Sequence, residues 1–248
     1  MARRHPRGRL SAAAGGDGVR ELVEVMDLLR SPGGCAWDAE QTHESLVPFA
    51  LEEAHEVAEA IEVGDRVGMR EELGDLLLQV VFHARLAQEH ESDPFDLDDI
   101  ARGVAAKLVR RHPHVFAAEG ETAGGQTGAP DEAGGDDADA VHTRWERIKK
   151  VEKQRTSVLE GIPLAQGALA RGQKVLSRAR RAGLVVTADA AAQRHVADAP
   201  EGQDVSAELG AQLLLLVAQA EAAGVDAESA LRAAVRTLDT AVRACETG

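Results

Sequence analysis

Two pairs of acidic residues are the part of the sequence best suited to chemistry. Glu53 and Glu56 form one pair, and Glu72 and Asp75 form the other. Residues three apart share a helix face, and a turn near Gly64 would make the two helices antiparallel, so the four carboxylates can converge. Converging carboxylates repel one another unless a cation compensates their charge. Oxygen-only ligands predict a Mg²⁺ site, with Mn²⁺ also possible.

The segments that carry these acids have helical periodicity, over residues 45–62 and 67–88. Gln79 continues the polar stripe of the second segment one turn beyond Asp75. Apolar residues of that segment recur at the spacing of an amphipathic helix, at Leu73, Leu76, Leu77, Val80, Val81 and Ala84. Further helices are predicted over 19–29, 96–111, 141–153 and 164–182, with a loop over 35–42.

The composition favours packing of helix on helix. Of the 248 residues, 44% are hydrophobic, but only 2% are aromatic and none is tyrosine. Strands are typically enriched in aromatic and β-branched residues, whereas this core must be built from Leu, Val and Ala. The sequence therefore predicts an all-α helical bundle.

The charge excludes some classes of partner. With a formal net charge of −14, the chain has no general attraction for nucleic acid or an anionic membrane, and we expect neither as a partner. Residues 1–18 are basic without a following apolar run, which indicates a disordered tail rather than a secretion signal. The two cysteines, Cys35 and Cys245, cannot form a multi-disulfide framework, which favours a cytoplasmic location.

The last third of the chain is similar to the first. Residues 208–217 align with residues 72–81, and Ala211 then stands where the first copy has Asp75. We interpret 161–248 as a degenerate second repeat of the helical unit. The other expected parts are a catalytic domain, a flexible acidic linker rich in Gly, Ala and Asp, and a helical segment that completes the site, over 19–118, 119–140 and 141–160.

Several motifs in the same order resemble the MazG-type nucleoside triphosphate pyrophosphohydrolases. Glu-Glu-x-x-Glu at residues 52–56, followed by Glu-x-x-Asp at 72–75, is similar to the signature of this family. Residues 32–42 are similar to its GGCPWD-xx-QT segment, with Ala36 where proline is usual. Residues 107–116 and 144–149 also look like family segments. The resemblance is strong over residues 20–160 and weak afterwards.

This resemblance implies an all-α bundle, usually a homodimer, that cleaves nucleoside triphosphates between the α and β phosphates. The products would be a monophosphate and pyrophosphate, and the biological role would be housecleaning of the nucleotide pool. The residues that match the family's metal ligands are Glu53, Glu56, Glu72 and Asp75. Glu52 would support them, or Glu52 or Glu53 would orient the attacking water.

Basic and aromatic residues at helical spacing are candidates for substrate binding. Lys107 and Arg111 are suited to grip the triphosphate tail, although basic residues at the end of a helix are also ordinary. Trp145 and Lys149 form a second pair at this spacing, for base stacking and phosphate binding. Trp37 is an alternative base platform, and simple packing is the competing interpretation of both tryptophans.

Two other functions stay open at this point. Glu-x-x-His occurs at 40–43 and 52–55, a spacing used by di-iron carboxylate bundles, which need the two motifs on facing helices. A helical module that binds nucleotides or a partner without hydrolysis is the non-enzymatic alternative, favoured by the degenerate second repeat.

Overall fold

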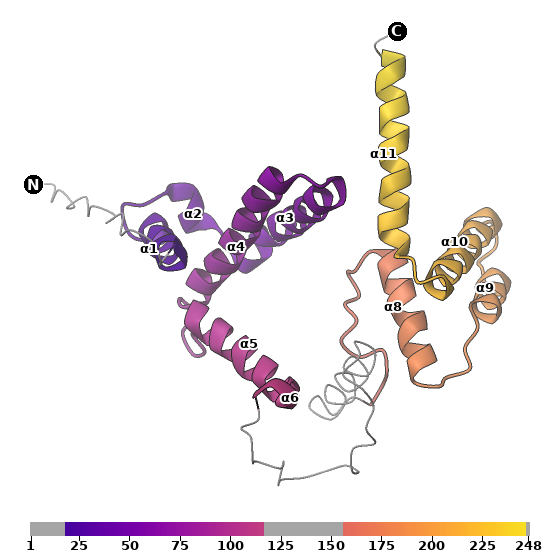
Figure 1. Ribbon diagram of the computed structural model, residues 1–248, viewed down its shortest axis with the longest axis horizontal. Coiled ribbons are helices and arrows are strands. Elements are labelled where there is room, and N and C mark those ends of the chain that lie inside the picture. The colour runs from indigo at the N-terminus through magenta and orange to yellow at the C-terminus, as the bar shows by residue number, and fades with distance from the viewer. Residues whose placement is uncertain (1–17, 117–155, 247–248) are drawn as a thin grey trace, which may run out of the picture. The chain divides into compact units, whose positions relative to one another are not determined.

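The computed structural model describes residues 18–116 and 156–246 (Figure 1). All regular secondary structure in these two ranges is helical, as predicted. The chain divides into two compact units, Met1–Ala129 and Pro130–Gly248. The predicted linker, the helix over 141–153, and all of the basic tail except Gly18 lie outside the described residues.

The first unit carries both acidic pairs on its two longest helices. Its elements are α1 (Gly18–Arg30), α2 (Ala36–Glu40), α3 (His43–Val63), α4 (Arg66–Ala87), α5 (Leu97–Arg111) and the short α6 (Pro113–Phe116). The predicted bounds of α1, α3, α4 and α5 are close to those observed. The prediction of a loop over 35–42 is wrong, because α2 lies inside it.

Local signals set the ends of α3 and α4 and make them an antiparallel pair. The Thr42 hydroxyl accepts a hydrogen bond from the amide of Ser45, and the Ser45 hydroxyl accepts one from the amide of Thr42, which caps the start of α3. Gly64 ends α3 with a φ of 75°, a conformation that favours glycine. The Asp65 carboxylate accepts hydrogen bonds from the amides of Val67 and Gly68 and so starts α4.

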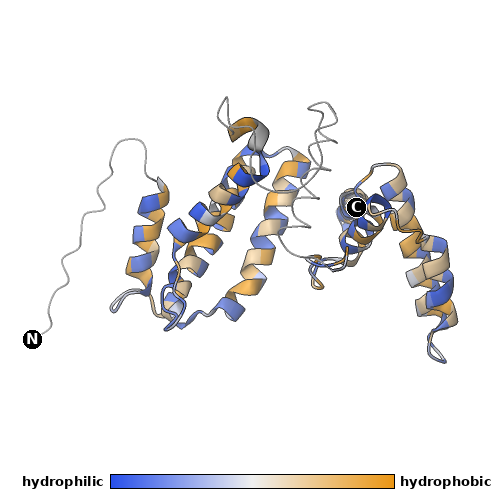
Figure 2. Cartoon of the chain, turned by 90° about the horizontal axis from the view of Figure 1, so that it is seen from below, coloured by the Kyte–Doolittle hydropathy of each residue, from blue (hydrophilic) through white to orange (hydrophobic). Residues whose placement is uncertain are grey.

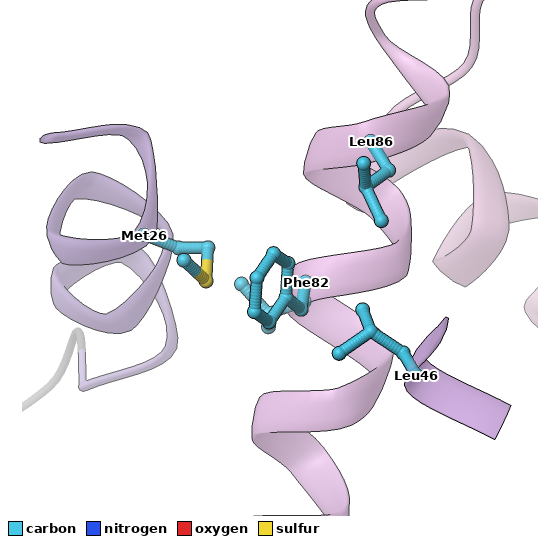
Figure 3. Close-up of a cluster of buried hydrophobic side chains, with 5 residues drawn as sticks. Met26, Leu46, Phe82 and Leu86 are labelled. Atoms are coloured by element: carbon cyan, nitrogen blue, oxygen red, sulfur yellow. The ribbon is translucent and has the colours of Figure 1, made fainter. Parts of the chain in front are cut away.

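A small apolar core joins α1, α3 and α4 (Figure 3). It consists of Met26 from α1, Leu46 from α3, and Val81, Phe82 and Leu86 from α4. Met26 and Leu46 are each only 1% exposed. The three helices therefore share buried surface, and burial of these apolar side chains holds α1, α3 and α4 together.

The second unit consists of four main helices within the described range, α8 (Ala168–Arg181), α9 (Ala188–Ala197), α10 (Asp204–Ala222) and α11 (Ala227–Glu246). The helix predicted over 164–182 begins later than expected, and α9 was not predicted. In this unit α10 packs against α9 and α8, as α4 packs against α3 and α1 in the first unit. The order in which the helices pack is therefore the same in both units.

Hydrophobic and hydrophilic residues alternate along the helices of both units (Figure 2), which is typical of amphipathic helices. Within the described part of the chain, no helix taken alone has the length and apolarity of a membrane span; α10 and α11 reach that composition only as a pair bent by 110°.

Candidate metal and nucleotide site

Three carboxylates from α3 and α4 converge on one point. One oxygen atom each of Glu53, Glu56 and Glu72 lies within 4.8 Å of the others. Glu53 and Glu56 share a face of α3, and the tight turn at Gly64 brings Glu72 of the antiparallel α4 opposite them. The structure thus brings together three of the four predicted metal ligands.

The pKa of Glu53 is raised by its surroundings in the cluster. Burial raises the pKa of Glu53 from its ordinary 4.5, and the charges of Asp75, Glu56, Glu72 and Glu52 raise it further in that order. Asp75 lies outside the group of three, yet it exerts the largest charge effect on Glu53. A group whose neighbours are all anionic is stabilised by a cation.

Glu72 is perturbed in the same direction. Burial is the largest cause of its raised pKa, and the charge of Glu56 across the helix pair is the next. The donor set consists of carboxylate oxygens, which are the preferred ligands of hard divalent cations such as Mg²⁺. The residues present therefore fit a magnesium ion.

A buried amide extends the polar face of α4. Gln79 is 8% exposed, and its Oε1 atom accepts no hydrogen bond from the described residues. Gln79 lies four residues after Asp75, so the two side chains share a helix face. An unpartnered buried acceptor is costly, and this one lies on the stripe that carries the acidic cluster.

An aromatic surface adjoins the acidic cluster. Trp37 on α2 is 51% exposed and contacts Phe49 edge-on, with ring centroids 6.0 Å apart, and Phe82 at 6.4 Å. Phe49 precedes Glu53 by four residues, about 6 Å along α3. Trp37 therefore packs against a residue of α3 that lies about one helical turn before Glu53.

Comparison with known proteins agrees with this geometry. A family model described as the MazG nucleotide pyrophosphohydrolase domain matches residues 41–116, which include both acidic pairs. A nucleoside triphosphate pyrophosphohydrolase/pyrophosphatase MazG of Thermotoga maritima is 36% identical over 225 residues, 87% of this chain and 80% of that protein. The chain belongs to the MazG family.

Other relatives extend the similarity over much of the chain. An uncharacterised 26.1 kDa protein from the blaB 3′ region of Streptomyces cacaoi is 46% identical over 228 residues, 91% of this chain and 81% of that protein. A nucleoside triphosphate pyrophosphohydrolase of Escherichia coli is 40% identical over 169 residues, 66% of this chain and 58% of that protein. The first alignment is long enough to reach well into the second unit.

The MazG chain carries its predicted phosphate-binding residues on α5. Lys107 is half-buried, and Arg111, at the last residue of the helix, is buried with 7% exposed. Both side chains were expected to grip the triphosphate, but Arg111 is buried. Lys107 is the more accessible of the two. Trp145 and Lys149 lie outside the described residues.

A histidine pair links α3 to α4 and was not predicted. The rings of His43 and His83 stack at 5.1 Å with an interplanar angle of 1°, and their Nδ1 atoms are 2.8 Å apart. His83 is half-buried, and burial lowers its pKa, with a smaller effect from His43. No local pattern joins residues so distant in sequence.

The histidine pair also bears on the di-iron alternative. His43 turns its ring toward His83, while Glu40 ends α2. Glu52 and His55 both lie exposed on α3. The two Glu-x-x-His motifs are therefore not on facing helices, as a di-iron bundle requires.

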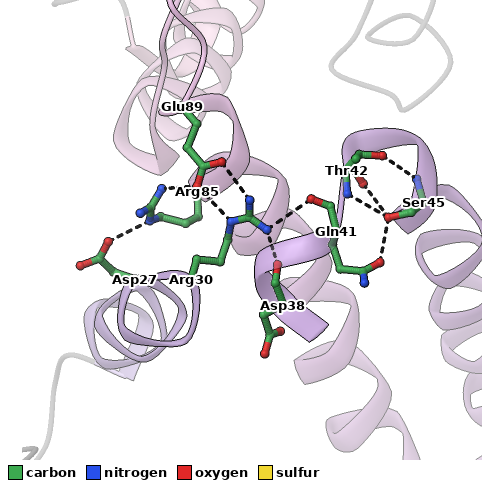
Figure 4. A network of polar contacts seen from close by, with 8 residues as sticks. All are labelled: Asp27, Arg30, Asp38, Gln41, Thr42, Ser45, Arg85 and Glu89. Carbon is green, nitrogen blue, oxygen red and sulfur yellow. Dashed lines mark hydrogen bonds and ion pairs between the residues drawn. The ribbon is translucent and has the colours of Figure 1, made fainter. Parts of the chain in front are cut away.

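A second unpredicted feature is a network around Arg30 (Figure 4). Arg30, the last residue of α1, donates from Nε and Nη2 to the Glu89 carboxylate at 3.0 and 2.8 Å. Arg85 donates to Glu89 at 2.9 Å and to Asp27 at 2.8 Å. The network therefore connects the end of α4 to α1.

Proposed function

We propose that this MazG chain hydrolyses nucleoside triphosphates between the α and β phosphates, releasing a nucleoside monophosphate and pyrophosphate. The observation that carries the proposal is the convergence of Glu53, Glu56 and Glu72 in the domain that matches the family model. The relatives from Thermotoga maritima and Escherichia coli, named for this activity, support it.

The acidic cluster is proposed to hold the divalent cation, Mg²⁺ or alternatively Mn²⁺. Glu53, Glu56 and Glu72 would bind it with Asp75, whose charge already acts on Glu53. A bound Mg²⁺ would draw in phosphate oxygens, stabilise their charge and make a water molecule more acidic. The raised pKa values of Glu53 and Glu72 support this assignment, because a cation removes the repulsion that causes part of the shift.

One carboxylate of α3 is proposed to act on the attacking water. Glu52 or Glu53 would orient a water molecule and accept its proton. The water oxygen forms a bond to the α-phosphorus, the bond to the bridging α,β oxygen breaks, and pyrophosphate leaves with that electron pair. Positioning and charge stabilisation supply most of the acceleration in such reactions.

The substrate is proposed to lie between the acidic cluster and the nearby aromatic and basic residues. Trp37 would support the base, because its ring is half exposed and packs against Phe49, one helical turn before Glu53. Lys107 would hold the triphosphate with Arg111. Trp145 and Lys149 are proposed as a further stacking and phosphate pair.

The test is a panel of NTPs and dNTPs incubated with the purified chain and Mg²⁺, with identification of the products. We expect pyrophosphate and monophosphate in equal amounts, and loss of both when EDTA is present. Release of orthophosphate alone would assign a different phosphatase chemistry. Binding of nucleotide with no product would assign the non-hydrolytic alternative.

The second unit is proposed to be a degenerate copy without chemistry of its own. Its order of helices parallels that of the first unit, and Ala211 stands where the first copy has Asp75. We further propose a cytoplasmic homodimer that cleans the nucleotide pool. Light scattering of the purified chain measures its mass in solution, and a monomer would contradict this assembly.

A further inference from the structure

We propose that Arg30 is a positioning residue for nucleotide binding: it holds α2, and through α2 the indole of Trp37, in place against Phe49 of the helix that carries Glu53 and Glu56. This inference rests on the proposed function for its consequence in catalysis. Its structural part, that Arg30 fixes Trp37, stands on the contacts of the first unit alone.

The guanidinium of Arg30 is buried and almost fully bonded. The Arg30 side chain is 6% exposed, and it shares two hydrogen bonds with the Glu89 carboxylate. Its Nη1 donates to the main-chain carbonyl oxygens of Asp38 and, at 3.3 Å, Gln41. A buried charge persists only when it is paired and bonded in this way, and these partners come from the segment just after α4 and from the end of α2.

The helix α2 depends on such support because it is too short to be stable alone. It spans five residues, and its N-cap Cys35 makes no side-chain capping bond. A helix of this length leaves its terminal carbonyls without partners within the helix. Arg30 binds the carbonyl of Asp38, which also accepts from the Gln41 amide at 3.4 Å, and the carbonyl of the C-cap residue Gln41 (Figure 4). Its positive charge suits the negative end of the helix dipole.

The chain entering α2 is also held against α1. The amide of Cys35 donates to the carbonyl oxygen of Leu29 at 2.8 Å. At Gly34 the approach is so close that an added Cβ would lie 2.2 Å from the Leu29 oxygen. The turn therefore fixes the start of α2, and Arg30 fixes its end.

Trp37 receives its position from the same group. The Arg30 guanidinium lies over the ring of Phe82, 5.6 Å from its centroid, and Phe82 contacts Trp37 edge-on. The Gln41 side chain donates to the Trp37 carbonyl oxygen at 2.9 Å, next to the Gln41 carbonyl that Arg30 binds. Loss of the Arg30 side chain would remove the hydrogen bonds to the end of α2 and the contact with the Phe82 ring, against which Trp37 packs.

Arg85 provides a matched control within the same network. It also donates to Glu89 and joins α1 to α4 through Asp27, and neither of these partners lies on α2. Arg85→Gln therefore removes two ion pairs, with Asp27 and Glu89, while Arg30 remains to bind the α2 carbonyls. Differences between Arg30→Gln and Arg85→Gln report on α2 rather than on general loss of charge pairing.

The first experiment needs no catalysis. In a Trp145→Phe background, Trp37 is the sole tryptophan of the chain, and its fluorescence anisotropy reports how firmly it is held. We expect Arg30→Gln to lower the anisotropy of Trp37 and to increase its quenching by acrylamide, and Arg85→Gln to leave both close to the parent. Equal values for Arg30→Gln and the parent would overturn the proposal.

The second experiment measures steady-state kinetics in the chain with Trp145 intact. We expect Arg30→Gln to raise the KM for nucleoside triphosphates roughly tenfold, the scale of losing one base-on-aromatic contact, with kcat nearly unchanged. Inhibition by tripolyphosphate, which has no base, should keep its inhibition constant. A fall in kcat alone, or an equal loss of tripolyphosphate binding, would overturn the positioning role.

The two experiments distinguish a failure of this inference from a failure of the proposed function. A parent chain that releases no pyrophosphate would reject the proposed function, while the anisotropy comparison would still decide whether Arg30 holds Trp37. If circular dichroism shows that Arg30→Gln does not fold, Arg30→Lys takes its place. Lysine keeps the charge but lacks the planar fork that binds Glu89 and two carbonyls together, so the same changes in anisotropy and KM are expected.

Discussion

Glu53 on α3 and Glu72 on α4 hold carboxylate oxygens within 4.8 Å of each other and of Glu56. The turn at Gly64 and Asp65 makes this possible, because it reverses the chain within two residues. Each of the two acids has a raised pKa, for which burial is the largest cause. The carboxylates therefore repel one another, and a divalent cation bound between them would relieve this repulsion.

Removal of a cluster carboxylate should abolish turnover without unfolding the chain. We expect Glu53→Ala or Asp75→Ala to lower kcat/KM by more than about 100-fold, the upper range for losing a group that only supports a metal ligand. Pyrophosphate release with Mg²⁺ measures the effect, and circular dichroism checks the helical content. Glu208→Ala, at the position of the second unit that aligns with Glu72, is the control and should retain activity; full activity of Glu53→Ala would reject the site.

The stacked histidines should make the stability of the chain depend on pH. Burial lowers the pKa of His83 below its ordinary 6.5, so the unfolded chain binds a proton more readily than the folded one. The stabilising contribution is therefore present above about pH 6.5 and is lost as the pH falls below it. Urea unfolding at about pH 7.5 and about pH 5.5 measures the loss.

The control for this prediction is His83→Phe, which keeps an aromatic ring against His43 and removes the titrating group. We expect a smaller loss of unfolding free energy between the two pH values in this variant than in the parent. An identical pH dependence in both proteins would show that the pair does not titrate in this range.

The small core should be sensitive at Leu46 and insensitive at its neighbour. Leu46 is 1% exposed within the cluster that joins α1, α3 and α4, whereas Val47 is 51% exposed. Leu46→Ala should lower the free energy of unfolding by about 3 kcal/mol through lost burial and a cavity. Val47→Ala should change it by less than about 0.5 kcal/mol, and similar losses in the two variants by urea unfolding would contradict the assigned core.

Two glycine substitutions should have opposite signs. Gly64 has a φ of 75° at the end of α3, so Gly64→Ala should destabilise by about 1–2 kcal/mol because alanine is strained in that conformation. Gly103 lies inside α5, where an added Cβ meets nothing within 4 Å. Gly103→Ala should stabilise by up to about 1 kcal/mol, and thermal melts of the two variants distinguish the outcomes.

The sequence by itself determined the features that arise within a few residues of each other. Apolar spacing along α4, the turn at Gly64 and the acid spacing of three on α3 are local, because helix geometry repeats every few residues. These patterns were sufficient to predict the helical class, the antiparallel pair and the acids that line it. The short α2 was missed, since five residues carry too little periodicity and the helix is held from outside.

Only the tertiary structure decided which distant side chains meet. His43 and His83 stack across α3 and α4, Arg30 reaches both Glu89 and the end of α2, and Trp37 lies against Phe49. Such contacts depend on how whole helices pack and on which face each one buries. The acidic residues could therefore be identified from the sequence. The contacts that hold Arg30 and Trp37 in place could be identified only from the folded unit.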